Sequence, residues 1–141
     1  MPAETPWTPF SPVPGVPPLT PTVLAETLDG GQAFRWHRET TPSELTVWLG
    51  VWAGHLTRLR LAPEGSLEFS APASLAPHVA SALPRYLATD RDWSALTDSL
   101  PWRSDVHMAR CLATFPGLRI LRQPFGETLL GFLCSATKQI V

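Results

Sequence analysis

Short β-patterned segments separated by turn residues limit the fold of this chain more than any other feature. The pattern recurs in residues 23–28, 33–38, 44–52, 55–61 and 66–70, and the first of these segments fits a turn of helix equally well. Glycine, proline, serine and aspartate punctuate the intervals between them. Strand patterns this close in sequence, joined by such residues, favour an antiparallel meander.

Helical patterns follow the strand patterns. Trp48 and Trp52 make a second face of the central segment apolar, so one face of the sheet should pack against helices. Arg58 and Arg60 alternate with leucines, which predicts that their side of the sheet faces solvent. We therefore expect an α+β fold, a small antiparallel β-sheet with packed helices. One middle helix should be capped by Asp92 and bury Trp93, Leu96 and Leu100. The next should begin at Ser104-Asp105 and bury Val106, Ala109, Leu112 and Ala113.

The first 22 residues differ in composition from the rest. Residues 1–22 contain eight of the sixteen prolines. Proline fixes φ and lacks a donor, so this density supports extended structure or disorder rather than helices or central strands. We expect a proline-rich, disordered tail.

Length, charge and cysteine content exclude several classes of protein. A chain of 141 residues with a formal net charge of −1 is about one domain, and any surface for nucleic acid must be a local patch. Cys111 and Cys134 lie far apart in the sequence, and we expect both to be reduced core residues. We expect no disulfide, no metal and no cofactor. There is no basic-then-apolar leader and no apolar run of the ~20 residues that a membrane span needs. We expect a soluble cytoplasmic protein.

Residues 30–36 combine two glycines, two aromatic residues and a cation in one short run. Gly30 and Gly31 permit positive φ and close approach of another molecule to the backbone. Phe34 and Trp36 share one side of the alternation that follows. One interpretation is a glycine-led turn that opens a strand whose aromatic residues are core; the other is a ligand site at the glycines.

The helical pattern from residue 125 has almost no polar face before residue 137. A helix that is apolar all round is expected to be buried on all sides. No later element of the 141 residues is available to cover it. We therefore expect this helix to be a stability liability in isolation, which should result in self-association or disorder.

Three separated motifs carry a family resemblance. They are the run of residues 31–36, Trp48-x-Gly50-Val51, and residues 121–124 leading into residues 128–135. In this order and spacing, residues 22–141 resemble the amino-terminal half of an 8-oxoguanine DNA glycosylase. The resemblance implies an α+β amino-terminal domain in residues 23–123, and in residues 124–141 the first helix of a truncated all-α catalytic domain.

The resemblance also implies a function and a set of site residues. Enzymes of this family flip an oxidised guanine out of duplex DNA and cut its glycosidic bond with a lysine nucleophile assisted by an aspartate. A main-chain carbonyl reads the extruded base, and the family's glycine aligns with Gly31. The expected lesion-recognition residues are Gly31, Gln32 and Phe34.

Two departures from the family pattern affect this expectation. The helix-hairpin-helix that carries the catalytic lysine and aspartate would lie beyond residue 141, and Lys138 is the sole lysine present, so no catalytic residue is expected in this chain. The family commonly ends its Cys-Ser motif with asparagines, and the position of the first is Thr137 here, followed by Lys138 and Gln139; these three residues are the expected DNA contacts.

The expected partner is damaged double-stranded DNA, and a separate chain with the helix-hairpin-helix is one way to complete the enzyme. The alternatives are a noncatalytic module that binds DNA or a repair protein, and a remnant of such an enzyme.

Overall fold

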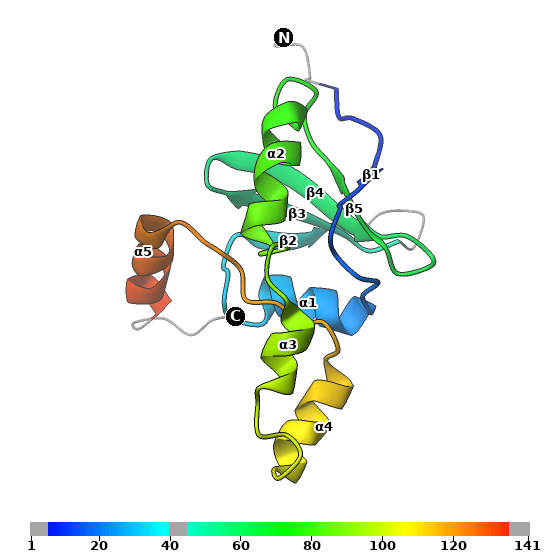
Figure 1. Cartoon of the computed structure of the whole chain (residues 1–141). Helices are drawn as coiled ribbons and strands as arrows, with labels where there is room; N and C mark the ends of the chain where they lie inside the picture. Colours follow the sequence, from blue (N-terminus) through cyan, green and yellow to red (C-terminus); the bar gives the residue numbers. More distant parts are fainter. Residues whose placement is uncertain (1–5, 40–44, 136–141) are drawn as a thin grey trace.

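The computed structural model describes residues 6–39 and 45–135, which form a five-stranded antiparallel sheet with helices on and beside it (Figure 1). The strands are β1 (Ser11–Pro12), β2 (Trp36–Glu39), β3 (Val47–Trp52), β4 (His55–Leu61) and β5 (Leu67–Ser70). Their order across the sheet is β1-β5-β4-β3-β2. The α+β fold is confirmed, and the predicted meander is observed from β2 to β5.

The first segment of the predicted meander is a helix, α1 (Pro21–Asp29). The Thr20 hydroxyl accepts a hydrogen bond from the Val23 amide at 3.2 Å, and Pro21 occupies the first turn, where its missing N–H is not needed. The buried residues recur at helical spacing: Val23, Leu24, Thr27 and Leu28. This spacing favours the helix over the strand that the sequence also allowed.

The segment before α1 lies against the sheet, so the prediction of a disordered tail is wrong for residues 6–22. Ser11 of β1 lies opposite Phe69 of β5, and the side chains of Val13 and Leu19 are buried. An edge strand tolerates proline because the missing N–H can face away from the sheet. The prolines are therefore compatible with an edge strand, and they do not prevent the pairing of β1 with β5. Residues 1–5 of the predicted tail lie outside the described residues.

The same segment covers a face of the sheet that was expected to be solvated. Arg58 and Arg60 form ion pairs with Glu39 and Glu68 at 2.8 and 2.7 Å. Their guanidinium groups also lie 4.1 Å from the ring centroid of Trp7 and 4.0 Å from that of Phe10, respectively. Both arginines are half-buried. The alternation placed them on the correct side, but it could not reveal the covering segment.

The other face of the sheet packs against α2 (Ala76–Tyr86), which lies across it in Figure 1. Val79 and Leu83 of this helix are buried in one cluster with Trp52 and Leu59 of the sheet. Pro84 lies inside the helix, which continues to Tyr86. This cluster is the core of the domain, and it places the carboxyl end of α2 beside the end of β3.

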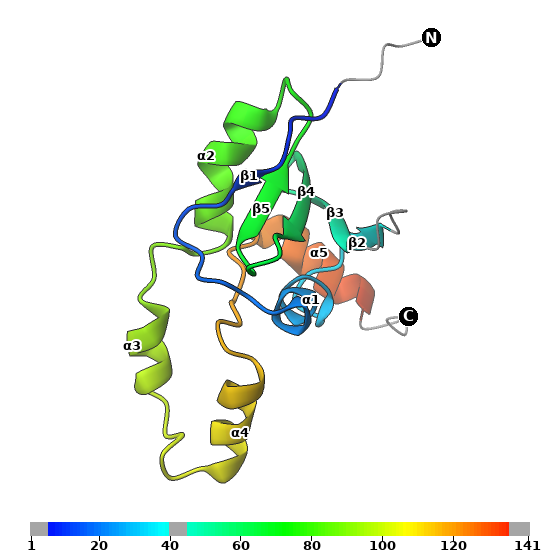
Figure 2. The same cartoon turned by 90° about the vertical axis from the view of Figure 1, so that its right-hand side faces the viewer.

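The helices α3 (Trp93–Asp98) and α4 (Val106–Thr114) project away from the sheet (Figures 1 and 2). Asp92 and Asp105 cap them as the sequence indicated, accepting hydrogen bonds from backbone amides. The predicted burial of their apolar faces is wrong, since both helices lack buried residues and Val106 is 73% exposed. Because these helices lie apart from the sheet, this region holds no core for their apolar faces to enter.

The last described helix, α5 (Phe125–Ser135), is also largely exposed. Burial on all sides is therefore not observed, and the prediction that Cys111 and Cys134 are core residues is wrong as well, because both are exposed. Within the described ranges, no helix combines the length and apolarity that crossing a bilayer requires.

Candidate functional site

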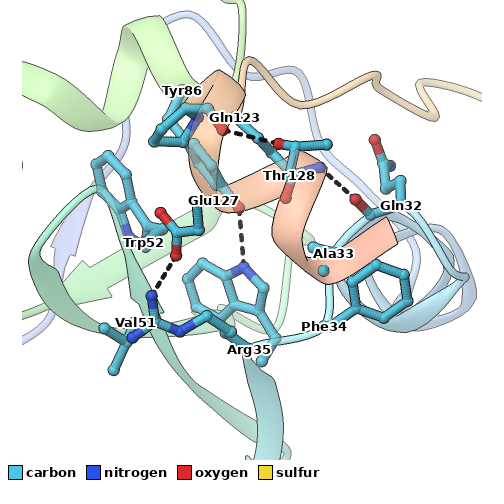
Figure 3. A pocket seen from close by; sticks show the side chains of 13 residues that line it. Gln32, Ala33, Phe34, Arg35, Val51, Trp52, Tyr86, Gln123, Glu127 and Thr128 are labelled. Atoms are coloured by element: carbon cyan, nitrogen blue, oxygen red, sulfur yellow. Dashed lines mark hydrogen bonds and ion pairs between the residues drawn. The ribbon is translucent and has the colours of Figure 1, made fainter. Parts of the chain in front are cut away.

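A small pocket lies where the loop before β2, the end of β3, the end of α2 and α5 meet (Figure 3). Its volume is about 50 Å³, well below the roughly 300 Å³ at which ligand pockets begin. The pocket brings the predicted residues Gln32 and Phe34 together with α5; Gly31 lies just outside it. The lining residues are Gln32, Ala33, Phe34, Arg35, Trp36, Val51, Trp52, Tyr86, Gln123, Pro124, Glu127, Thr128 and Gly131.

Gly31 forms an open turn at the rim of this site. Its φ is +96°, a conformation that L side chains rarely adopt. Among the described residues, no atom lies within 4 Å of the position that a Cβ at Gly31 would occupy. Gly31 is also exposed. The glycine is therefore required by the backbone, and the space beside it is free for another molecule.

Gln32 connects this turn to distant parts of the chain. Its Nε2 donates to the carbonyl of Thr27 at 3.0 Å and to that of Arg119 at 2.8 Å, and its Oε1 accepts from the Leu121 amide at 2.9 Å. In addition, Gln123 donates a hydrogen bond from Nε2 to the main-chain carbonyl of Gln32. These bonds hold the turn to residues 119–123, the segment that leads into α5.

Phe34 and Trp36 do not share an environment, although the alternation placed them on one side. Trp36 is 3% exposed, and its ring lies directly over Gly50, where an added Cβ would come within 2.2 Å of it. Phe34 is 39% exposed and its ring lies against α5, 3.0 Å from where a Cβ on Gly131 would stand (Figure 3). The period of a strand fails here because β2 begins only at Trp36.

Buried aromatic residues form the base of the pocket. The Trp36 indole donates from Nε1 to the Tyr86 hydroxyl at 3.0 Å, and the ring of Trp52 stacks on that of Tyr86 at 4.4 Å. Burial raises the pKa of Tyr86 to about 12; the hydrogen bond from Trp36 opposes this rise and the negative charge of Glu127 adds to it. Tyr86 is therefore a neutral phenol near pH 7, unsuited to act as a base.

Glu127 joins α5 to the sheet. Its carboxylate pairs with Arg35 (Figure 3), and its second oxygen accepts from the Ala53 amide at 3.0 Å. Ala53 has a φ of +48°, so this bond holds a strained turn between β3 and β4.

No site role was predicted for Glu127, and Gln123 was noted only within a family motif, because each contacts a partner about ninety positions away. Their spacing of four residues around Pro124, which places both near the start of one helix, was the available signal.

The three predicted DNA contacts, Thr137, Lys138 and Gln139, all lie outside the described residues. Within the described part of the chain, no group of three histidine, cysteine, aspartate or glutamate side chains is placed to hold a metal ion.

The family model for the N-terminal domain of 8-oxoguanine DNA glycosylase matches residues 18–129. The chain belongs to this family. The match confirms the resemblance seen in the sequence motifs. It extends from just before α1 into α5, and it includes the Gly31 turn and all the pocket-lining residues up to Thr128. The segment that carries Trp7, Phe10 and β1 precedes the matched region of this 8-oxoguanine glycosylase domain.

Solved structures of 8-oxoguanine glycosylases share the fold. The chain is 25% identical to MBOgg1, solved in complex with a low-affinity DNA ligand, with a TM-score of 0.64 over 81% of this chain and 36% of that one. It is 25% identical to the Clostridium acetobutylicum 8-oxoguanine glycosylase/lyase in its apo form, with a TM-score of 0.64 over 82% of this chain and 38% of that one.

The same Clostridium acetobutylicum enzyme, in complex with double-stranded DNA that has cytosine opposite 8-oxoG, gives a TM-score of 0.63 at 25% identity, over 82% of this chain and 37% of that one. The chain thus spans little more than a third of the length of these proteins. No curated protein sequence matches the chain.

Proposed function

We propose that this chain is the amino-terminal part of a DNA glycosylase that recognises 8-oxoguanine in duplex DNA and takes part in its excision. Membership of the 8-oxoguanine glycosylase family supports this proposal. The likeness to a glycosylase/lyase solved with double-stranded DNA supports DNA as the partner. The single observation that carries the proposal is the Gly31 turn, which is exposed, left-handed and open on the side where a Cβ would stand.

The chemistry of the lesion explains why a main-chain carbonyl is suited to read it. Guanine has an acceptor lone pair on N7, whereas 8-oxoguanine has a hydrogen there, so a carbonyl attracts the lesion and repels the normal base. A net hydrogen bond contributes about 0.5–1.5 kcal/mol, and an unsatisfied acceptor facing the carbonyl costs about 1–3 kcal/mol. Together they give roughly ten- to a thousandfold discrimination. In our proposal, the Gly31 carbonyl makes this contact.

In our proposal, the pocket of Figure 3 is not the site of the extruded base. That pocket holds about 50 Å³, and stacked aromatic rings form its base. In the proposal the base lies against the outer side of the Gly31 turn, and a complementary domain forms the opposite wall of its site. The exposed Phe34 lies three residues from Gly31 and is the nearest large aromatic surface in sequence.

Catalysis requires groups that these 141 residues do not supply. Lys138 is the sole lysine of the sequence and does not align with the family's nucleophile. The complementary domain would provide the lysine and the aspartate, either in a longer polypeptide or as a separate chain. The chain alone should therefore form no borohydride-trapped adduct with an 8-oxoguanine duplex. An adduct that survives Lys138→Ala would contradict the assignment of the nucleophile to the complementary domain.

The Gly31→Ala variant tests the recognition step in the complemented protein. The measurement compares single-turnover excision of 8-oxoguanine opposite cytosine with cleavage of an abasic site, which presents no base. We expect Gly31→Ala to lower excision by about tenfold or more and to change abasic-site cleavage by about twofold at most. Gly54→Ala is the matched control, because Gly54 also has positive φ and free space around its Cβ position. Equal losses on both substrates would show that Gly31 is a structural turn residue.

A further inference from the structure

Gln32 has little capacity left to contact a base directly. Both of its side-chain N–H groups are used, on the carbonyls of Thr27 and Arg119, and its oxygen accepts from the Leu121 amide. An amide side chain has only two donors, so one acceptor lone pair is all that remains. The Gln32 side chain therefore bonds within the protein, and it has no donor left to offer to a base.

The contacts of Gln32 fix the peptide that carries the Gly31 carbonyl. That carbonyl belongs to the peptide bond between Gly31 and Gln32, so its direction depends on where Gln32 is held. The Gln32 side chain joins the last turn of α1 to residues 119–121. Its own carbonyl accepts from Gln123 Nε2, two residues before α5. Arg119 is itself buried and donates from Nη1 to the carbonyl of Leu87 at 3.1 Å, so the anchor is connected to the segment that follows α2.

We infer that Gln32 is a positioning residue, which sets the direction of the Gly31 carbonyl by tying the glycine turn to the segment that enters α5. This inference rests on the proposed function, because it assumes that the Gly31 carbonyl reads the lesion. It assigns lesion specificity to a residue that does not touch the base. The same contacts connect the glycine turn to α5. A domain that binds α5 would therefore have a fixed position relative to the Gly31 carbonyl.

Gln32→Glu is the sharpest test, because it keeps the shape and replaces the donors with a carboxyl group. In the ionised form, the carboxylate faces the carbonyls of Thr27 and Arg119 and repels both, while it can still accept from Leu121. In the protonated form, the O–H can donate to one of these carbonyls, which restores part of the anchor. The surrounding carbonyls favour the neutral carboxyl, so the pKa of this glutamate should be raised.

The expected readout is a pH profile of lesion selectivity in the complemented protein. At pH 8 we expect Gln32→Glu to lose about ten- to a hundredfold in the ratio of 8-oxoguanine to guanine excision, since small displacements of a reading group have effects of this size. As the pH falls through the raised pKa, the selectivity should recover. The wild type should not show this recovery. Glu64→Gln, the reverse exchange in an exposed turn, is the matched control and should leave the profile unchanged.

A second measurement on the isolated chain keeps the inference separate from the proposed function. Hydrogen exchange of the Leu121 amide reports the anchor without DNA, because Gln32 Oε1 accepts from this amide; exchange should be faster in Gln32→Leu, which removes the acceptor, while the protein remains folded. A wild type that shows no preference for 8-oxoguanine would overturn the proposed function, whatever the exchange shows. A selective wild type with an equally selective Gln32→Glu would overturn the positioning role. A loss of selectivity that is the same at every pH would overturn it too, because it would reflect a general loss of structure.

Discussion

The sheet and the three later helices treat their apolar side chains in opposite ways. In the sheet and α2, side chains such as Leu59 and Val79 are completely buried. In α3, α4 and α5, as described by the structure, no residue is buried. Both regions have sequence patterns that predict burial. An apolar periodicity therefore predicts an amphipathic or apolar helix, but it does not show that the rest of the same chain buries the apolar face.

Truncation of one leucine in each region gives the largest expected contrast. Leu59 is 0% exposed in the centre of β4, and Leu59→Ala should lower the free energy of unfolding by about 2–5 kcal/mol through lost burial and a cavity. Leu130 of α5 is 65% exposed, and Leu130→Ala should change stability by less than about 0.5 kcal/mol. Urea denaturation measures both. A large loss in Leu130→Ala would show that α5 is buried in solution, for example in an oligomer.

A high-pH titration probes the core between the sheet and α2. Burial disfavours the phenolate and raises the pKa of Tyr86 to about 12 in the fold, from an ordinary value of 10.0. Between these two pH values the unfolded chain has lost the proton and the folded chain keeps it. The free energy of unfolding should therefore fall as pH rises from 10 to 12, by at most about 1.4 kcal/mol per pH unit. Tyr86→Phe removes this slope, and a phenol that titrates at its ordinary pKa would show an open core.

Those parts of the fold that depend on local interactions could be predicted from the sequence. The strands β3, β4 and β5 and the caps Asp92 and Asp105 follow from local patterns and turn chemistry, which act within a few residues. The family was predicted from three motifs in the sequence, and the match to the family model confirms it. What failed depended on distant contacts. The covering of Arg58 by Trp7, for example, joins positions that no local pattern connects.

The candidate site shows the same limit. Gly31 was predicted as a special turn, and its positive φ agrees with that prediction. The alternation that followed it predicted one environment for Phe34 and Trp36, but Phe34 is exposed and Trp36 is buried. The alternation fails because β2 begins only at Trp36, so Phe34 lies before the strand. Gln32 was proposed to touch the base, whereas the structure shows its side chain bonded to Thr27, Arg119 and Leu121. Such a role becomes visible only when residues about ninety positions apart are placed together.

The capping residue of α4 should have a local effect. The Asp105 carboxylate accepts from the amides of His107 and Met108 at 2.9 and 3.0 Å, which satisfies two free donors of the helix end. Asp105→Ala should destabilise α4 by about 0.5–2 kcal/mol. Because α4 projects from the sheet, hydrogen exchange should quicken in residues 106–114 and remain unchanged in β4. Equal effects in both regions would mean that the projecting helices and the sheet unfold as one unit.

The smallest effect is expected at the ion pair that joins the two regions. Glu127→Gln removes the charge that pairs with Arg35 but keeps an oxygen for the Ala53 amide. Exposed pairs contribute about 0.2–1 kcal/mol, so global stability should hardly change. Exchange in α5 should nevertheless quicken, because α5 buries no residue that would hold it to the sheet.

Glu68→Gln is the matched control, since Glu68 forms a comparable pair with Arg60 inside the sheet. In that variant α5 should keep its protection, because the rest of the sheet still holds β4 and β5 together. Loss of either ion pair should cost a similarly small free energy, but it should change hydrogen exchange only in α5, which has no buried residue to hold it. Unchanged exchange in α5 of Glu127→Gln would show that the packing of Phe34 on Gly131 is sufficient to hold the helix.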